Sequence, residues 1–429
     1  MILENLYNLF LQHPEISVDS RQIPEGCLFF GLRGEHFDGN EFAGSALKNG
    51  ASYAIIDDTR YQTDDQCILV ENVLSTLQHL ANHHRKQYRI PVLAITGTNG
   101  KTTTKEILHS VLSKKYQTLA TTGNFNNHIG VPITLLKLRR GTELAIVEMG
   151  ANHPGEIDLL CRIAEPTHGI ITNIGKAHLA GFGSFEGVVN AKTELFRFLK
   201  FHQGIAFVNT GNPLLVRCAE GMKIIPYNPG EVILRDEQND LQDSFLKMKI
   251  KINGQEIILS TKLFGSYNAE NILAAACIGH YFNVDPGQIK NAIESYEPQN
   301  NRSQILQTRN NLLILDMYNA NPSSLEPALQ NFSESKHDRK VIILGDMLEL
   351  GNESDQEHQN ILDLIEELGF TEVYLIGPVF TRLNKKMDWI CFLDSELARI
   401  WFDHHRLTGK VILIKGSRGI KLEKLVDFL

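Results

Sequence analysis

The residues with the clearest chemical potential lie in one glycine-rich stretch near residue 100. An uncharged apolar run over residues 91–96 is typical of a strand buried on both faces. It is followed by Gly97-Thr98-Asn99-Gly100-Lys101-Thr102 and then by apolar residues at helical spacing. A glycine loop between a strand and a helix presents backbone N–H groups and the positive end of the helix dipole to an anion. The pattern therefore predicts a phosphate-binding loop, in which Lys101 reaches the β- and γ-phosphates and Thr102 coordinates Mg²⁺.

The loop departs from the usual phosphate-loop pattern at one position. That pattern has a glycine five residues before the Gly-Lys pair, and Ile95 stands there in this chain. The alternative is an ordinary glycine-rich turn that begins a structural helix. We favour nucleotide binding, because a buried strand and a helix flank the loop on its two sides.

Length and composition indicate a multidomain globular protein. A chain of 429 residues is too long for one hydrophobic core, so two or three domains are expected. The net charge of −8 argues against nucleic-acid binding. Six scattered cysteines without a Cys-x-x-Cys pair are expected to be reduced core residues, and no basic stretch precedes an apolar run as in a signal peptide. We therefore expect a cytoplasmic protein without a membrane span, since the longest apolar stretch, residues 272–278, is far too short.

The alternation of elements predicts an α/β fold of three domains. Residues 1–86 form a small α/β unit, with strands at 27–32 and 52–56 and a helix between them at 41–49. Residues 87–300 form a central parallel-sheet domain around the phosphate loop. Residues 301–429 repeat a strand–helix alternation that is typical of a doubly wound, Rossmann-like sheet. Its strands are predicted at 312–316, 341–345, 373–377 and 411–415, with a fifth at 389–393.

Polar residues follow several of these predicted strands. In the central domain Glu148 ends the strand at 143–150, and the strand at 169–174 runs towards His178. Ligands of open α/β sheets bind at the carboxyl ends of strands, so Lys101, Glu148 and His178 are expected at one edge. In the last domain, polar clusters at 316–321, 345–347 and 415–418 indicate a second ligand edge across a cleft from the first.

Two further segments of the central domain have predicted structures. A polar loop at 121–132 leads into a predicted helix at 133–138. Asn253-Gly254 lies between the alternating runs 245–252 and 255–260, which predicts a hairpin at the margin of the central sheet. The histidine pairs 83–84 and 404–405 lack partners at metal-ligand spacing, so we expect them to be exposed.

Over nearly its whole length the chain resembles the ATP-dependent Mur ligases, which add amino acids to UDP-N-acetylmuramic acid in peptidoglycan synthesis. The resemblance rests on Thr96 to Thr102, Glu148-Met149-Gly150, Ala177-His178, Asn190-Ala191-Lys192, Asn268 to Asn271, Arg302 and Asp316. Four more stretches are similar to the members of the family that add D-alanyl-D-alanine. They are residues 126–132, 150–153, 318–322 and 345–351.

Two other functions stay open at this point. A sibling ligase adds the third residue, diaminopimelate or lysine, and usually has Tyr-Ala-His before the proline where this chain has Tyr318-Asn319-Ala320-Asn321-Pro322. Many siblings also carry an Asp-Asn-Pro-Arg motif, which this sequence lacks. From another class, a P-loop nucleotide-gated regulatory protein would hydrolyse ATP without an acceptor. The three-domain layout, with a carboxylate and a histidine at strand ends, favours a ligase.

The resemblance implies a role for each candidate of the nucleotide and metal site. ATP would be held by Gly97, Thr98, Asn99, Gly100, Lys101 and Thr102 at its phosphates, by Asn268 and Asn271 near the adenine, by Arg302 at a phosphate and by Asp316 at the ribose. Two Mg²⁺ ions are implied, the first on Thr102 and Glu148 and the second on His178 and a carbamylated Lys192. From its own sequence context Lys192 is expected to be a solvated helix lysine.

The resemblance also implies where the other substrates bind. Asp19, Ser20, Arg21 and Asp38, which by themselves are ordinary turn residues, would bind the uridine of UDP-N-acetylmuramoyl-tripeptide, and Asn127 would also contact substrate. Asn319 and Asn321 would bind D-Ala-D-Ala, with added charge from Lys415 and Arg418. For Lys415 and Arg418 the alternative is a solvated strand end. Tyr267 stands where many relatives have His. The enzyme is expected to act as a monomer.

Overall fold

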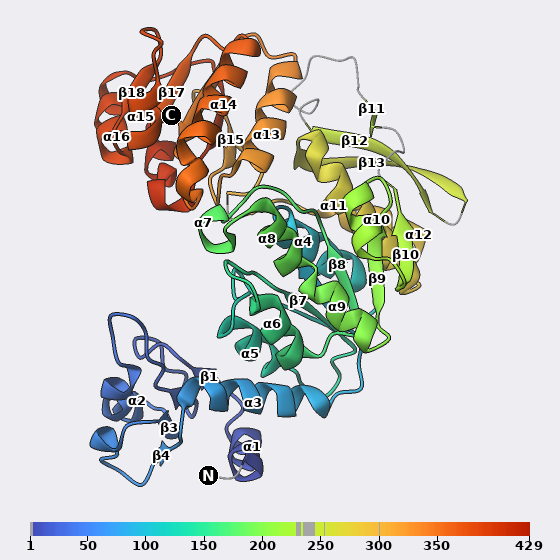
Figure 1. Ribbon diagram of the computed structural model, residues 1–429, viewed down its shortest axis with the longest axis vertical. Helices are drawn as coiled ribbons and strands as arrows, with labels where there is room; N and C mark the ends of the chain where they lie inside the picture. The colour runs from blue at the N-terminus through green and yellow to red at the C-terminus, as the bar shows by residue number, and fades with distance from the viewer. Residues whose placement is uncertain (1–2, 229–232, 235–244, 253, 300) are drawn as a thin grey trace.

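The computed structural model describes residues 3–228, 233–234, 245–252, 254–299 and 301–429. Three α/β units follow one another along the long axis, with the N-terminal unit at one end and the C-terminal unit at the other (Figure 1). Asn253 of the predicted hairpin turn and residue 300, the predicted end of the central domain, lie outside the described residues. Within the described ranges, no helix is both long and apolar enough to cross a membrane.

The N-terminal unit is a four-stranded parallel sheet in the order β1-β2-β3-β4. Its elements are α1 (Leu3–Gln12), β1 (Ile16–Ser17), β2 (Leu28–Phe30), η1 (Gly39–Phe42), α2 (Ala43–Lys48), β3 (Tyr53–Ile56), η2 (Thr59–Tyr61), β4 (Cys67–Leu69) and α3 (Val73–Lys86). Both predicted strands and the helical segment between them are confirmed. Helix α3 packs against α5 and α6 of the central unit and so joins the two (Figure 1).

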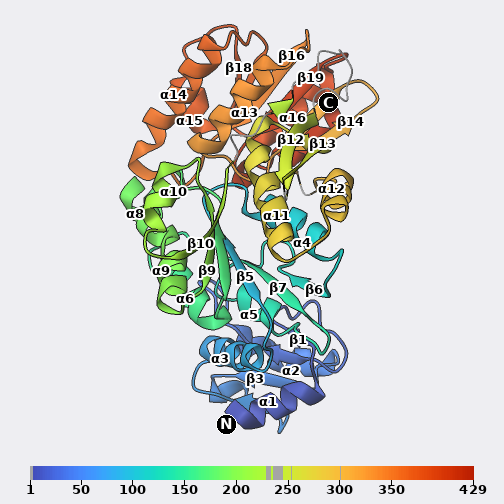
Figure 2. The ribbon, with the colours of Figure 1, turned by 90° about the vertical axis from the view of Figure 1, so that its right-hand side faces the viewer.

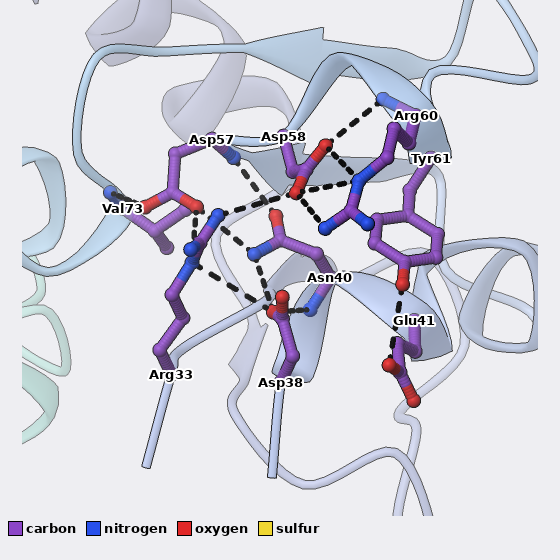
Figure 3. Close-up of polar contacts among 9 residues, drawn as sticks. All are labelled: Arg33, Asp38, Asn40, Glu41, Asp57, Asp58, Arg60, Tyr61 and Val73. Atoms are coloured by element: carbon purple, nitrogen blue, oxygen red, sulfur yellow. Dashed lines mark hydrogen bonds and ion pairs between the residues drawn. The ribbon is translucent and has the colours of Figure 1, made fainter. Parts of the chain in front are cut away.

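A polar network at the end of β3 fixes the loop that carries Asp38 (Figure 3). The fully buried Asn40 amide donates to Asp38 at 2.6 Å and to Asp57 at 2.9 Å, and its oxygen accepts from the Asp57 N–H at 2.9 Å. Asp57 also accepts from Arg33 Nε at 3.0 Å and from the Val73 N–H, at the start of α3, at 3.1 Å. The Asp57 side chain, at the end of β3, thus links the loop through Asn40 and the connecting helix through Val73.

The central unit is built on a six-stranded, fully parallel sheet in the order β10-β9-β8-β5-β7-β6. Its strands are β5 (Val92–Thr96), β6 (Thr118–Ala120), β7 (Leu144–Glu148), β8 (His168–Ile171), β9 (Ile205–Asn209) and β10 (Lys223–Tyr227). Its helices before residue 220 are α4 (Lys101–Leu112), α5 (Gly130–Leu135), α6 (Glu156–Ala164), α7 (Leu179–Phe182), α8 (Phe185–Lys192), α9 (Glu194–Phe201) and α10 (Pro213–Cys218). The strand, loop and helix predicted around residue 100 are β5, the glycine loop and α4.

Helix α5 begins three residues before its predicted start at 133. Asn127 Oδ1 accepts from the N–H groups of Ile129 and Gly130 at 3.1 and 2.9 Å, and this contact organises the first turn. Pro132 then falls in the first turn, where its missing N–H costs nothing. The proline therefore lies inside the helix start rather than before it.

The predicted hairpin is confirmed, but its predicted place at the margin of the central sheet is wrong. β11 (Ile233–Leu234), β12 (Phe245–Ile252) and β13 (Gln255–Phe264) form a separate antiparallel sheet. The apolar face of β12 and β13 packs in one core with α4 and with two helices that follow, α11 (Ala269–Tyr281) and α12 (Pro286–Ser295). The short η4 (Ser266–Asn268) connects β13 to α11. Figure 2 shows α11 and α12 beside α4. The hairpin covers helices and not the sheet edge, because that is where its alternating residues find apolar partners.

The C-terminal unit contains all five predicted strands in a six-stranded sheet of order β14-β15-β19-β16-β17-β18. They are β15 (Leu312–Asp316), β16 (Lys340–Gly345), β17 (Val373–Ile376), β18 (Ile390–Phe392) and β19 (Val411–Lys415), all parallel. The antiparallel edge strand β14 (Gln304–Gln307) is not predicted. The helices are α13 (Pro322–Glu334), η5 (Gly351–Glu353), α14 (Ser354–Glu367), α15 (Pro378–Leu383), α16 (Ser395–His404), η6 (Arg418–Ile420) and η7 (Leu422–Phe428). Strand order reverses around β19, which places the ends of β15, β19 and β16 at a switch point.

The six cysteines are all free thiols, and Cys27, Cys67 and Cys161 are buried while the other three are partly exposed. The prediction that the histidine pairs are exposed is correct for His404 and His405 and wrong for His84. The His84 ring is buried between α1 and the central unit, with the Tyr7 hydroxyl at 3.1 Å and the Leu138 carbonyl at 3.0 Å. Both ring nitrogens are therefore used inside the protein.

Candidate active site

A cavity of about 1080 Å³ lies between the central and C-terminal units. The central unit contributes the glycine loop, Glu148 and His178, and the C-terminal unit contributes Arg302, Asp316 and Lys415. The two ligand edges predicted from strand ends thus face one cavity. Asp346, from the predicted cluster at 345–347, is fully buried instead and accepts from the N–H groups of Val379 and Phe380 at 2.8 and 2.9 Å.

The glycine loop is fixed against the end of β8. A Cβ atom on Gly97 would lie 2.0 Å from the Thr172 hydroxyl, and Gly100 has the positive φ of 76° that glycine adopts readily. The Thr172 hydroxyl donates to the Asn99 carbonyl at 2.6 Å, and the Asn173 side chain accepts from the Asn99 N–H at 2.9 Å. These contacts hold the loop at the N-terminus of α4, the geometry that binds anions.

Lys101 folds back over its own loop. Its Nζ donates to the carbonyls of Gly97 and Thr98 at 2.8 and 3.0 Å. Burial lowers the pKa of Lys101 to about 8, with the nearby Glu148 carboxylate opposing this and Arg302 adding to it. An anion such as a phosphate in the cavity would therefore stabilise the charged form of Lys101.

Glu148 ends β7 inside the cavity wall and is almost completely buried. Its Oε1 accepts from the Thr102 hydroxyl at 3.1 Å and from the Asn126 amide at 2.8 Å. Its Oε2 is buried without a hydrogen-bond partner in the described residues, and the ammonium of Lys105 lies 3.8 Å away. A buried, unpartnered carboxylate oxygen beside a hydroxyl suits a hard cation such as Mg²⁺.

Asn126 and Lys105 belong to this site, and neither was singled out as a site residue from the sequence. Asn126 lies directly before Asn127 and begins the stretch 126–132, which carries the family resemblance. Its place in that stretch could have identified Asn126 as a site residue. Lys105 follows Lys101 by four residues and Thr102 by three, which places all three on one side of α4. That spacing could have identified Lys105.

His178 lies after β8, at the start of α7, and lines the cavity. Its Nδ1 is 2.6 Å from a carboxylate oxygen of Glu349, which belongs to the C-terminal unit and lines the same cavity. The contact has an ion-pair distance but not the geometry of a hydrogen bond, and the close approach of the His178 ring keeps the pKa of the Glu349 carboxyl below its usual range. Glu349 is a third residue of this site that the sequence alone did not identify.

Lys192 is buried, with 2% of its surface exposed, so the expectation of a solvated helix lysine is wrong. It is the last residue of α8, its Nζ donates to the Ala151 carbonyl at 3.3 Å, and it lies 5.4 Å from the centre of the Phe182 ring. Burial, together with the charge of Lys101, lowers the pKa of Lys192 to about 7. Lys192 does not line the cavity itself, but Ala151, which accepts its hydrogen bond, does.

The C-terminal side of the cavity carries the candidates for the ribose, phosphates and acceptor. Asp316 and Lys415 lie opposite one another at the ends of β15 and β19 and form an ion pair. Lys415 is 2% exposed, which contradicts the alternative of a solvated strand end, whereas Arg418 is exposed. The Tyr318 ring lies 3.4 Å from the Arg302 guanidinium carbon and 5.6 Å from that of Arg418.

Asn268 and Asn271 are buried where α11 meets the glycine loop. The Asn271 oxygen accepts from the Thr104 hydroxyl at 3.0 Å, and its amide donates to Asn268 at 2.9 Å. Tyr267, also at the cavity, has its hydroxyl 3.0 Å from the Ser303 hydroxyl. These side chains join the central unit to the first residues of the C-terminal unit.

The predicted substrate residues fall into three groups. Asn127 and Asn319 line the cavity. Asn321 does not, because its amide donates to the Asn99 side chain at 2.9 Å and its oxygen accepts from the Ser323 hydroxyl at 2.9 Å. The N-terminal candidates do not line the cavity either: Asp19, Ser20, Arg21 and Asp38.

A phosphate-binding loop on a parallel sheet, facing a second parallel-sheet unit across one cavity, defines a nucleotide-dependent P-loop enzyme. Three family models match the chain in succession. They are the Mur ligase family catalytic domain over residues 14–96, the Mur ligase middle domain over 95–279 and the Mur ligase glutamate ligase domain over 301–418. The chain belongs to the Mur ligase family.

Two curated relatives of this chain have the same name. The UDP-N-acetylmuramoyl-tripeptide–D-alanyl-D-alanine ligases of Bacillus subtilis and Escherichia coli are each 32% identical, over 96% of this chain and 92% and 93% of their own. Among solved structures, MurF from Acinetobacter baumannii superimposes with a TM-score of 0.85 at 31% identity, covering 96% of this chain and 92% of that one. The MurF ligase of Thermotoga maritima in complex with ADP gives 0.84 at 26% identity, covering 96% of each chain.

Proposed function

We infer that the protein is the ATP-dependent ligase that joins D-alanyl-D-alanine to UDP-N-acetylmuramoyl-tripeptide in peptidoglycan synthesis. One observation carries the inference beyond family membership. Each of the four stretches similar to D-alanyl-D-alanine-adding enzymes supplies lining residues to the same cavity, among them Asn126, Asn152, Asn319 and Glu349. Those stretches are far apart in the sequence, so their meeting at one cavity supports a common role in binding the same substrates.

The chemistry requires activation, because an amide does not form from a carboxylate and an amine in water without it. We propose that the tripeptide carboxylate attacks the γ-phosphate of ATP, giving an acyl phosphate and ADP. The amine of D-Ala-D-Ala then attacks the acyl carbon, loses a proton, and phosphate leaves as the amide forms. Two anions meet in the first step, so cations have to reduce their repulsion. Lys101 on one side of the cavity and Arg302 on the other are placed to do this.

Magnesium is proposed from the donor atoms of the cavity. The Thr102 hydroxyl and the unpartnered Glu148 oxygen would hold a first ion with the phosphates, and His178 and Lys192 are assigned to a second. No cluster of three His, Cys, Asp or Glu side chains that could hold a metal is found in the described part of the chain. This agrees with a metal bound largely through nucleotide oxygens, as is usual for Mg²⁺. Bound there, Mg²⁺ would supply positive charge at the transferred phosphoryl group.

Lys192 can contribute to a metal site only if its amine is converted into an anion. We propose that the neutral amine adds CO₂ and releases one proton, leaving a carbamate. Burial and the charge of Lys101 favour the neutral amine that this reaction needs. The charges of Glu156 and Glu194 oppose this fall in the Lys192 pKa but do not cancel it.

The remaining assignments follow from the proposed reaction. The unit of residues 1–86, with Asp19, Ser20, Arg21 and Asp38, would bind the uridine end of the substrate, 87–300 would bind ATP, and 301–429 would bind the dipeptide and cover the nucleotide. Because ATP and a UDP-linked precursor are both consumed, we propose that the enzyme acts in the cytoplasm. We also propose that it acts as a monomer.

One measurement separates this function from its alternatives. Phosphate release is followed with ATP alone, with muramoyl-tripeptide added, and with D-Ala-D-Ala added as well. The proposed ligase releases phosphate quickly only when both are present. Use of diaminopimelate or lysine with a muramoyl-dipeptide would identify the sibling ligase, and hydrolysis independent of any acceptor would identify a regulatory ATPase.

A further inference from the structure

The loop that follows β16 carries Glu349 out of the C-terminal unit and onto the central one. The two residues before Glu349 are hydrogen-bonded within the C-terminal unit. The His358 ring accepts from the Met347 N–H at 2.9 Å, and the Ser417 hydroxyl accepts from the Leu348 N–H at 2.9 Å. Glu349 is the first residue of the loop whose contacts cross to the other unit. The anchoring therefore fixes where its carboxylate can reach.

On the central side the contact is equally well defined. The Ala180 N–H donates to the Glu349 carbonyl at 3.2 Å, and the Glu349 carboxylate lies 2.6 Å from Nδ1 of His178. A Cβ atom on Gly351 would lie 3.2 Å from Ala180 Cα, and Gly351 has a positive φ of 59°, so glycine suits this close approach. Backbone and side chain thus dock the loop on α7 together.

Both members of the pair hold an unusual backbone conformation. His178 has φ of 52° and Glu349 has φ of 69°, the left-handed region that favours glycine. Residues with such backbones cluster at functional sites, where surrounding structure maintains them. Here two of them, from different units, meet side chain to side chain at the wall of the cavity.

We propose that Glu349 is a positioning residue that orients His178 for metal binding, and does so only when the C-terminal unit is docked. The proposal rests on the proposed function, which makes His178 a metal ligand. The carboxylate oxygen lies 2.6 Å from Nδ1, at ion-pair distance but without hydrogen-bond geometry. At this distance the carboxylate favours a proton on Nδ1 over a lone pair there, and with a proton on Nδ1 the Nε2 of the neutral ring keeps its lone pair for a cation in the cavity. Without Glu349 the ring is free to turn and to carry its proton on Nε2, which removes the ligand.

The proposal is tested with three variants in the full-length protein. Glu349→Ala removes the acceptor, while Glu349→Gln keeps an oxygen that accepts from Nδ1–H. Lys176→Ala is the matched control, because Lys176 pairs with Glu357 at 2.6 Å across the same joint. Among the described residues, Lys176 forms no hydrogen bond or ion pair with His178. A mere loss of docking would affect Glu349→Ala and Lys176→Ala alike.

Two readouts are combined. In ¹⁵N-histidine-labelled protein, with the His178 signals assigned by their loss in His178→Gln, the wild type and Glu349→Gln should show the Nδ1–H tautomer and Glu349→Ala should not. In ligation assays Glu349→Ala should lose roughly 10–100-fold in kcat or in apparent Mg²⁺ affinity, and Glu349→Gln should recover most of it. Lys176→Ala should change these values less than about threefold, below the lower end of that range.

Several results would overturn the proposal. They are an unchanged tautomer in Glu349→Ala, an equal loss in Lys176→Ala, or no recovery in Glu349→Gln. A wild type that shows no acceptor-dependent phosphate release would refute the proposed function instead, and the tautomer measurement would still report whether Glu349 orients the ring. The two failures are therefore distinguishable.

Discussion

Asn321 offers a decisive test of how the two units meet at the nucleotide loop. Its amide donates to the Asn99 oxygen at 2.9 Å, and the Asn99 amide reaches the Asn321 oxygen at 3.4 Å and the Ser323 hydroxyl at 3.1 Å. The family resemblance assigns Asn321 to D-Ala-D-Ala, but these contacts favour a role in docking the C-terminal unit on the phosphate loop. Asn321→Ala distinguishes the two roles.

The size of the effect follows from the contacts that are lost. Each neutral hydrogen bond contributes about 0.5–1.5 kcal/mol net, and the half-exposed Asn99 can rehydrate after the change. We expect a loss of about 1–2 kcal/mol, or roughly 5–30-fold in kcat/KM. Because docking assembles the whole cavity, kcat/KM should fall by the same factor for ATP and for the dipeptide.

The assay is steady-state phosphate release with ATP and D-Ala-D-Ala varied in turn. Asn319→Ala is the matched comparison, because Asn319 lines the cavity and should affect the dipeptide selectively. A double-mutant cycle of Asn99→Ala with Asn321→Ala should give a coupling energy of about 1 kcal/mol. A rise in the KM for the dipeptide alone, with no coupling to Asn99, would refute the docking role and restore the original assignment.

Three further changes test the nucleotide loop, the buried lysine and the N-terminal network. Lys101→Met should abolish ATP turnover with an unchanged circular dichroism spectrum, and near-wild-type ligation would refute the phosphate-loop assignment. Lys192→Ala should lose about 3 kcal/mol of transition-state stabilisation, roughly a hundredfold in rate, with partial recovery in acetate or formate. Recovery with alkylamines alone would contradict the carbamate. Asn40→Ala leaves Asp38 and Asp57 short of donors and should destabilise the N-terminal unit by about 1–3 kcal/mol, measured as faster amide exchange in β2 and β3 with α4 as the internal control.

The features that the sequence predicted well are those set by neighbouring residues. Strands β15 and β19 have the predicted bounds because each is an apolar run that stops at a charged residue, Asp316 or Lys415. The glycine loop is similar, since its chemistry is contained in a few consecutive residues. Parallel strands bring their carboxyl ends to one edge, which is why Lys101, Glu148 and His178 could be expected together.

The features that were missed depend on contacts between distant residues. The burial of Lys192 is decided by the packing of α8 next to Ala151 and Phe182, which its sequence neighbours do not reveal. His84 is buried because α1 packs over α3 and brings Tyr7 to its ring. The hairpin of β12 and β13 follows the apolar faces of α4 and α11. In each case the surroundings of the residue are set by a packing partner that is distant in the sequence.

The contacts between the central and C-terminal units share one property that links the fold to the reaction. Asn99 lies in the phosphate loop, His178 lies at the cavity wall, and Lys176 lies between the end of β8 and His178. Each of these central residues thus lies in, or within two residues of, a group assigned to ATP or metal. A ligand that orders these segments stabilises the docked state by the same free energy with which docking strengthens ligand binding. We therefore expect nucleotide binding and assembly of the dipeptide side of the cavity to form one coupled equilibrium. Variants at the Asn99–Asn321 or His178–Glu349 contact should change both, whereas the half-exposed Lys176–Glu357 pair should contribute little.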